Sequence, residues 1–470
     1  MSLNIRKSLL QLIFSGAYMK RWNDRLRPAE LIEIDKQAHK MIIAWLLCRL
    51  SGSGRSQAER IALEEKVVEG GIFDYLFRLV ITDIKPPVLD RIRADPEHYR
   101  LLAAWAAGEI ESRIRPLDNA FFLRFKEHIN NPEAGGDAAD ILGAAHTLAS
   151  AWELRLLLTV NDSFDEEIKD IGKQFRRRTD AYAHVPGVPG MAAVFNGRAG
   201  ADAASLARPP YPGAGGSPPC ADGRNSGVGG GQPGVAGSGL PARACGPETE
   251  YAAAARFAAL CGRLRFQKRW SQVPRIPETS VMGHMFITAC YAYFLSMSLN
   301  ACPARRVNNF FTALFHDLPE LLTRDIISPV KKSTAGLEQL IRAYEQDELQ
   351  RRVLGPLAAG GCAPIADRLS YYLGLEAGSE FQECVIRDGK VQAVSFAELQ
   401  SNGNRDELDP KDGEALKICD ILAAFIEAYT AMRNGITSDQ IQQSFWRMRE
   451  QNAGRKLGDI HIGALFMDFD

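Results

Sequence analysis

The sequence has no apolar run long enough to cross a membrane and almost no excess charge of either sign. The longest apolar stretches, such as residues 286–295, reach about half of the ~18 residues that suggest a transmembrane helix. The formal net charge of the 470-residue chain is −1 at pH 7, so no overall field would draw in nucleic acid or an anionic membrane. We therefore expect neither nucleic acid nor a membrane as a partner.

Paired cysteine motifs and a clear leader sequence are also lacking. The nine cysteines are odd in number and scattered, with no C-x-x-C pair, which indicates neither a disulfide framework nor a structural zinc site. The first residues carry a basic flank, but the apolar stretch behind it is short and interrupted by Gln11, which is not typical of a signal peptide. These features predict a cytoplasmic protein with reduced thiols.

Residues 186–247 are rich in glycine and proline and poor in aromatic residues. Such a segment cannot bury enough apolar surface to offset the entropy lost on ordering, so it is predicted to be a disordered linker. It would divide the chain into an N-terminal domain, 1–185, and a C-terminal domain, 248–470.

Both domains are predicted to be helical, which makes the fold class all-α. Apolar residues recur at spacings of three and four, for example in 141–160 and 281–299, whereas strand-like alternation is scarce. The exception is 383–396, where two short alternating stretches flank Asp388-Gly389 and predict a β-hairpin. Residues 304–322 are expected to form one helix with a kink near Pro319.

Two imidazoles and two carboxylates stand on predicted helices in the C-terminal domain. They are His284, the adjacent pair His316-Asp317, and Asp420. Ionisable groups inside apolar helices are costly unless they are paired or bind a metal, and a mixed N/O set suits one divalent ion such as Mn²⁺, Co²⁺, Fe²⁺ or Mg²⁺. Glu320 follows His316 by four residues and would lie near the same site. The alternative is that these side chains make structural polar contacts only.

The order of these motifs resembles that of the HD-domain metal-dependent phosphohydrolases. Gln267-Lys268-Arg269-Trp270, then Arg275 to His284, His316-Asp317-Leu318-Pro319-Glu320 and Thr323 to Lys331 together look like the subfamily that contains the bacterial 5′-deoxynucleotidases. The resemblance implies an all-helical HD-domain bundle that removes phosphate from deoxynucleoside monophosphates.

Residue roles follow from this resemblance by matching position. It implies that His284, His316, Asp317 and Asp420 are the metal ligands and that Glu320 transfers a proton. It also implies that Arg269 holds the substrate phosphate, that Trp270 packs on the sugar, and that Asp325 contacts the sugar or positions the attacking water. One departure is Gly283, which stands where the subfamily tends to have an acidic residue.

The N-terminal domain contains an echo of the same plan. Lys20-Arg21-Trp22 precedes His39 much as Lys268-Arg269-Trp270 precedes His284, and the segment from His146 to Glu153 resembles that from Asp420 to Glu427. Asp74-Tyr75 stands where the His-Asp pair would be, so a complete metal site is not expected there. Duplication followed by decay, giving a degenerate HD-like copy, and chance similarity between helices are the two interpretations.

The sequence therefore predicts a metal-dependent phosphohydrolase, specifically a 5′-nucleotidase acting on (deoxy)nucleoside monophosphates. One alternative is an HD phosphohydrolase of another phosphate ester, such as a nucleoside triphosphate or cyclic nucleotide. Another is a non-catalytic HD module that senses nucleotides. The expected partner is a small-molecule phosphate ester, and assembly into a homo-oligomer is left open.

Overall fold

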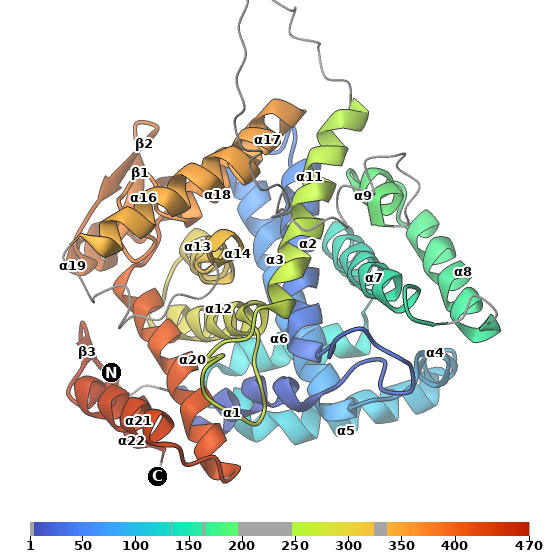
Figure 1. The fold of residues 1–470 in the computed structure, drawn as a ribbon, viewed down its shortest axis with the longest axis horizontal. Coiled ribbons are helices and arrows are strands. Elements are labelled where there is room, and N and C mark those ends of the chain that lie inside the picture. The colour runs from blue at the N-terminus through green and yellow to red at the C-terminus, as the bar shows by residue number, and fades with distance from the viewer. Residues whose placement is uncertain (1–3, 133, 162–164, 196–246, 324–335, 470) are drawn as a thin grey trace, which may run out of the picture.

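The computed structural model describes residues 4–132, 134–161, 165–195, 247–323 and 336–469. The fold is all-α, as predicted, with two small two-stranded antiparallel sheets among the described residues. Helices surround a buried centre, and the two described ends of the chain lie close together (Figure 1). Lys7 joins them by donating a hydrogen bond to the carbonyl of Asp468 at 3.0 Å.

The described part of the N-terminal half consists of helices joined by loops. They are α1 (Lys7–Ser15), η1 (Gly16–Tyr18), α2 (Glu33–Ser51), α3 (Gln57–Ile81), α4 (Pro86–Arg93), α5 (Pro96–Ile114), α6 (Asn119–Asn130), α7 (Asp137–Leu157), α8 (Glu166–Ala181) and α9 (Val188–Phe195).

The C-terminal half adds the two sheets to its helices. Its helices up to the first sheet are α11 (Pro247–Cys261), η2 (Gly262–Phe266), α12 (Val281–Ser298), α13 (Pro303–Phe315), α14 (Glu320–Thr323), α16 (Leu337–Leu349), η3 (Gln350–Leu354), α17 (Gly355–Leu357), η4 (Ala358–Cys362) and α18 (Ala363–Tyr372). The remaining elements are β1 (Cys384–Arg387), β2 (Lys390–Ala393), α19 (Phe396–Glu398), η5 (Leu399–Gly403), η6 (Asp406–Leu408), α20 (Glu414–Arg433), α21 (Asp439–Asn452), β3 (Lys456–Leu457), β4 (Ile460–His461) and α22 (Gly463–Met467).

The predicted hairpin is confirmed. Strands β1 and β2 pair antiparallel with Arg387 opposite Lys390, and Asp388 and Gly389 form the turn with φ of 51° and 72°. Two positive φ angles in a two-residue loop are what an Asp-Gly turn between twisted strands requires.

Two predicted boundaries are wrong. Residues 188–195, assigned to the linker, form α9, whose Val188, Met191 and Phe195 are buried. The Gly/Pro content of the segment predicts a linker, but its apolar residues pack against α11, a contact that local composition does not reveal. The helix predicted for 304–322 also breaks, since α13 ends at Phe315 and α14 begins only at Glu320. The rest of the predicted linker, 196–246, lies outside the described residues.

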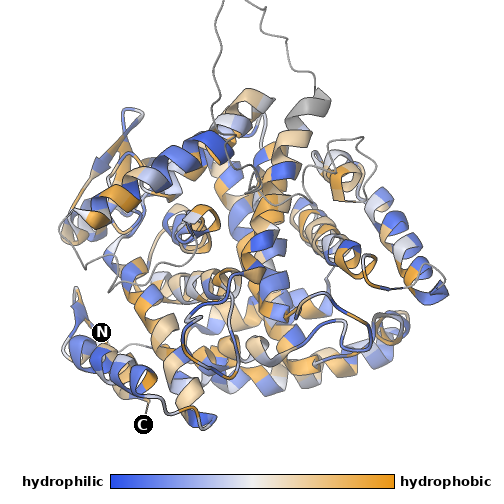
Figure 2. Cartoon of the chain, in the orientation of Figure 1, coloured by the Kyte–Doolittle hydropathy of each residue, from blue (hydrophilic) through white to orange (hydrophobic). Residues whose placement is uncertain are grey.

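Helices α2 and α12 pack on each other at the centre of the molecule. Residues 33–48 and 281–296 are buried throughout, as expected for helices that are covered on all sides. The buried apolar side chains of both halves join one core, whereas peripheral helices such as α8 and α16 carry many hydrophilic residues (Figure 2). No helix in the described ranges combines the length and the apolarity that a membrane span needs. The two predicted domains are therefore in direct contact and share apolar packing.

The two halves repeat one local plan. The backbone N–H of Arg21 donates to the carbonyl of Leu31 at 2.8 Å, and that of Arg269 donates to Thr279 at 3.0 Å. Trp22 and Trp270 both have φ of 55°, an uncommon conformation for a bulky residue. The recurrence of a strained backbone together with the same hydrogen bond favours an internal repeat over chance similarity.

This repeat corrects the expected counterpart of His284. Each Arg-Trp loop leads into a central helix after the same number of residues, so His284, the fourth residue of α12, corresponds to Lys36, the fourth residue of α2. His39 lies one turn further on, where its Nε2 donates to the Ala258 carbonyl at 2.9 Å and its Nδ1 accepts from Arg265 at 3.1 Å. Burial lowers the pKa of His39 to about 3, so it is a neutral structural residue that joins the halves.

Candidate metal centre

Three helices of the C-terminal half bring the predicted ligands together. Helix α12 begins after Ser280, whose side chain accepts the N–H of Gly283 and caps the helix, so His284 lies in the first turn. His316 and Asp317 follow the last residue of α13, and Asp420 lies on α20. The turn that ends α13 therefore directs two adjacent side chains toward residues that are far away in sequence.

The donor atoms of this cluster are close enough to share one ion. One atom each from His284, His316 and Asp317 lies within 4.8 Å of the others. Nε2 of His284 is 3.1 Å from Oδ1 of Asp420 and 3.9 Å from Oδ2 of Asp317. Nε2 of His316 is 3.3 Å from Oδ2 of Asp317 and 3.8 Å from Oδ1 of Asp420.

The orientation of His316 fits a metal ligand. Its Nδ1 donates to the backbone carbonyl of Ala313 at 2.7 Å, which leaves Nε2 as the nitrogen that faces the carboxylates. That Nε2 is buried and has no hydrogen-bond partner, a costly arrangement unless the atom binds something. Two imidazoles and two carboxylates would suit a divalent transition metal or Mg²⁺.

The electrostatics of the cluster also favour a cation. Burial alone would lower the pKa of His316, but Asp317 and Asp420 outweigh it and raise that pKa well above its usual value. Burial would raise the pKa of Asp317, but the neighbouring His316 and Arg269 lower it. Lys417, His284 and His316 likewise lower the pKa of Asp420 against the effect of burial, so two partly buried carboxylates stay ionised in a space that attracts positive charge.

Glu427, on α20, is the residue of this site that sequence reasoning did not single out. It is 1% exposed and accepts hydrogen bonds from Nε1 of Trp270 at 2.8 Å and from Thr279 at 2.8 Å. Its Oε1 is also 3.7 Å from Nδ1 of His284. At this distance the two groups form an ion-pair contact and no hydrogen bond, and a small movement would give the carboxylate–imidazole pair that orients ligating histidines. The sequence contains one signal for this residue: Glu427 follows Asp420 by seven residues, which is two helical turns, so both lie on the same face of the helix.

The residues predicted to bind substrate lie beside the cluster. Nη1 of Arg269 donates to Oδ2 of Asp317 at 3.1 Å. The Trp270 ring lies 5.7 Å from the Arg275 guanidinium, and Lys417 donates to Asp420 at 2.8 Å. Burial would lower the pKa of Arg269, but Glu427, Asp317 and Glu320, the last at the start of α14, raise it. Asp325 lies outside the described residues.

The N-terminal half places an acidic side chain, that of Asp35, beside Gly283. A Cβ on Gly283 would lie 2.8 Å from Oδ1 of Asp35 and 2.5 Å from Ile34. Asp35 comes from α2, is fully buried, and accepts a hydrogen bond from Ser280 at 2.6 Å. Gly283 is therefore required by the close packing of α2, and Asp35 holds the cap of the helix that carries His284.

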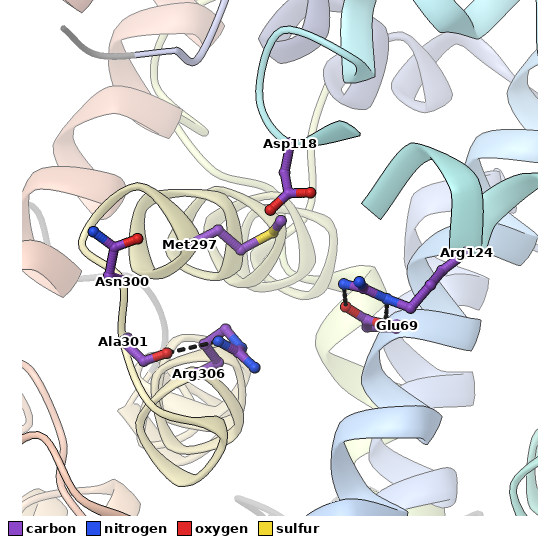
Figure 3. A pocket seen from close by; sticks show the side chains of 7 residues that line it. All are labelled: Glu69, Asp118, Arg124, Met297, Asn300, Ala301 and Arg306. Carbon is purple, nitrogen blue, oxygen red and sulfur yellow. Dashed lines mark hydrogen bonds and ion pairs between the residues drawn. The ribbon is translucent and has the colours of Figure 1, made fainter. Parts of the chain in front are cut away.

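The pocket in Figure 3 is separate from this centre. It has a volume of about 280 Å³ and includes Met297 near the C-terminal end of α12, about 20 Å from His284 at a rise of 1.5 Å per residue. Arg124 in this pocket donates to Glu69 at 2.8 and 2.6 Å, and Arg306 donates to the carbonyl of Ala301 and to Glu65. The two arginines that line the pocket, Arg124 and Arg306, are thus each paired with a carboxylate.

The helical fold and the His-His-Asp cluster together define a candidate metal-binding helical domain. Residues 261–449 match the family model of the HD domain, and this segment contains every candidate ligand. No match is found among curated proteins or solved structures. The match supports an HD-domain family for this part of the chain, and HD domains are in general metal-dependent phosphohydrolases.

Proposed function

We propose that the protein is a metal-dependent phosphohydrolase whose substrates are (deoxy)nucleoside monophosphates. The cluster of His284, His316 and Asp317, with Asp420 3.1 Å from His284 and with Arg269 beside Asp317, carries this proposal. In this proposal, the four residues hold one divalent ion. The ion would screen phosphate charge and lower the pKa of a water molecule.

The side chains of the protein provide substrate binding and proton transfer. Arg269 turns from Asp317 to the phosphate, for which its planar guanidinium offers two parallel donors. Glu320, which begins α14 four residues after His316, is the group that accepts and returns a proton. The Ala313 carbonyl keeps the His316 imidazole in a fixed orientation, and Glu427 lies 3.7 Å behind the His284 imidazole.

The charge around the centre favours a monophosphate over a triphosphate. Among the described residues, the cations nearest to the cluster are Arg269, Arg275 and Lys417, and each faces a carboxylate: Arg269 faces Asp317, Arg275 faces Glu427 at 4.0 Å, and Lys417 faces Asp420. In the part of the chain that the structure describes, little positive charge is therefore left to balance a triphosphate, whereas one ion and one arginine are enough for a single phosphate group.

The test is phosphate release by the full chain after removal of metal and reloading with Mn²⁺, Co²⁺, Fe²⁺ or Mg²⁺. The panel contains ribo- and deoxynucleoside monophosphates, nucleoside triphosphates and cyclic nucleotides. We expect metal-dependent release of inorganic phosphate, fastest from the monophosphates. Preferred hydrolysis of a triphosphate or a cyclic nucleotide would refute the substrate class, and absence of any release with all four ions would refute the enzyme.

A further inference from the structure

The N-terminal half retains the Arg-Trp-Glu unit that adjoins the candidate metal centre. Nε1 of Trp22 donates to Glu153 at 2.9 Å, as Trp270 donates to Glu427 at 2.8 Å. Nε of Arg21 also donates to Glu153, at 2.9 Å. The Arg-Trp pair that we assign to substrate binding is therefore repeated together with its buried glutamate.

The metal ligands, in contrast, are replaced by basic groups. Lys36 stands in the place of His284, and His146 stands in the place of Asp420, because each precedes its buried glutamate, Glu153 or Glu427, by seven residues. Nζ of Lys36 lies 2.6 Å from Nδ1 of His146. The two helical positions that hold His284 and Asp420 in the C-terminal half thus hold an amine and an imidazole here, and these groups are also in contact.

This exchange changes the charge at the two ligand positions. Where His284 and Asp420 place an imidazole and a carboxylate, Lys36 and His146 place an amine and an imidazole, and Arg21 lies nearby, bonded to Glu33 and Glu153. One ligand carboxylate is lost and one amine is gained, which favours an anion where the counterpart favours a cation.

Solvent reaches the cluster. His146 is exposed, and the side chain of Asp74 is 39% exposed, whereas Lys36 and Lys40 are buried beneath them. Burial lowers the pKa of Lys36 well below its usual value, and Arg21 and Lys40 add to this effect while Glu33 opposes it. An anion next to the amine would offset that destabilisation of the charged form.

We infer that Arg21, Lys36 and His146 form a second phosphate-binding site, here called the Lys36 site, which binds a nucleoside monophosphate without a metal and without hydrolysing it. The ammonium group of Lys36 takes the place of the metal ion, and Arg21 holds the phosphate as Arg269 does. The identity of this ligand rests on the function proposed above. The shared contact of α2 with α12 through Asp35 and Ser280 connects the Lys36 site to the metal centre.

The test counts binding equivalents of a non-hydrolysable nucleoside phosphonate by isothermal titration calorimetry of the full chain. With the activating metal present we expect two equivalents, and with a chelator we expect the one at the Lys36 site to remain. Lys36→Met, which keeps the length of the side chain, should weaken that metal-independent equivalent at least ~10-fold, the loss of one charge-assisted contact. Lys85→Ala, which removes an exposed lysine paired with Asp24, is the matched control and should keep both.

The outcomes separate this inference from the proposed function. A single equivalent that disappears with chelator would overturn the Lys36 site and leave the metal centre intact. A single equivalent that survives chelation and is lost in Lys36→Met would support the Lys36 site and contradict phosphonate binding at the metal centre. If Lys36→Met fails to fold, as judged by circular dichroism, His146→Ala at the exposed rim replaces it, and unchanged metal-independent binding in either variant overturns the inference.

Discussion

Replacement of Asp35 by asparagine should stabilise the protein, and it should do so only when the pH is high enough to ionise the carboxyl group. Asp35 is fully buried between α2 and α12, with one oxygen bonded to Ser280 and the other without a hydrogen-bond partner. Burial raises its pKa from 3.8 to about 6, although Ser280 partly opposes this. Asparagine keeps an acceptor for Ser280 and removes the charge.

The magnitude follows from the pKa difference. A folded pKa above the unfolded value means that Asp35 contributes no penalty below about pH 4, and that stability is lost as the pH rises through 6. The difference of roughly two pKa units corresponds to about 3 kcal/mol at ~1.4 kcal/mol per unit. Asp35→Asn should therefore gain up to that amount at pH 8 and almost nothing at pH 4.

Urea unfolding of wild type and variant at pH 4, 6 and 8 measures this gain. Asp24→Asn is the matched control, because a hydrogen bond from Lys85 lowers the pKa of Asp24. Its stabilising effect is present above the unfolded pKa and lost on acidification, so its removal should change stability in the opposite direction. A gain for Asp35→Asn that is equal at pH 4 and pH 8, or a loss at pH 8, would refute the reasoning.

Three further predictions concern the site and the division of the chain. Glu427→Gln should lower metal affinity by ~10–100-fold, because it weakens the group behind His284; equilibrium dialysis with the activating metal measures this, and unchanged affinity would contradict it. Glu320→Gln should keep the metal but lower kcat by ~10²–10⁴-fold, so a normal kcat would exclude it as the proton-transfer group. A fragment of residues 247–470 should be less soluble and less helical than the full chain, because it exposes the face of α12 that α2 covers; a monomeric fragment with native circular dichroism and full activity would contradict this.

Local patterns in the sequence were sufficient for part of the fold and of the site. Period-three and period-four apolar spacing predicted helices, and Asp388-Gly389 predicted the hairpin, because these signals act over a few residues. The order of His284, His316-Asp317 and Asp420 placed the candidate ligands in one family pattern, and the structure brings these side chains together.

Contacts across the two halves could not be predicted in the same way. Asp35 adjoins Gly283 only because α2 packs against α12, and α9 is helical because α11 covers its apolar side chains. His39 was paired with His284 on residue type, whereas the length of the loop before each helix assigns that position to Lys36. Backbone register thus decides which residues correspond when a repeat has diverged.

The most direct test of the central claim is the metal content and phosphate release of Asp317→Ala compared with wild type. Asp317 contributes a carboxylate to the cluster at 3.3 Å from Nε2 of His316, so its loss should remove bound divalent metal and hydrolysis together while the helical circular dichroism spectrum remains. Elemental analysis and a phosphate assay on the same sample decide the question. Full metal occupancy with wild-type phosphate release in Asp317→Ala would contradict the account.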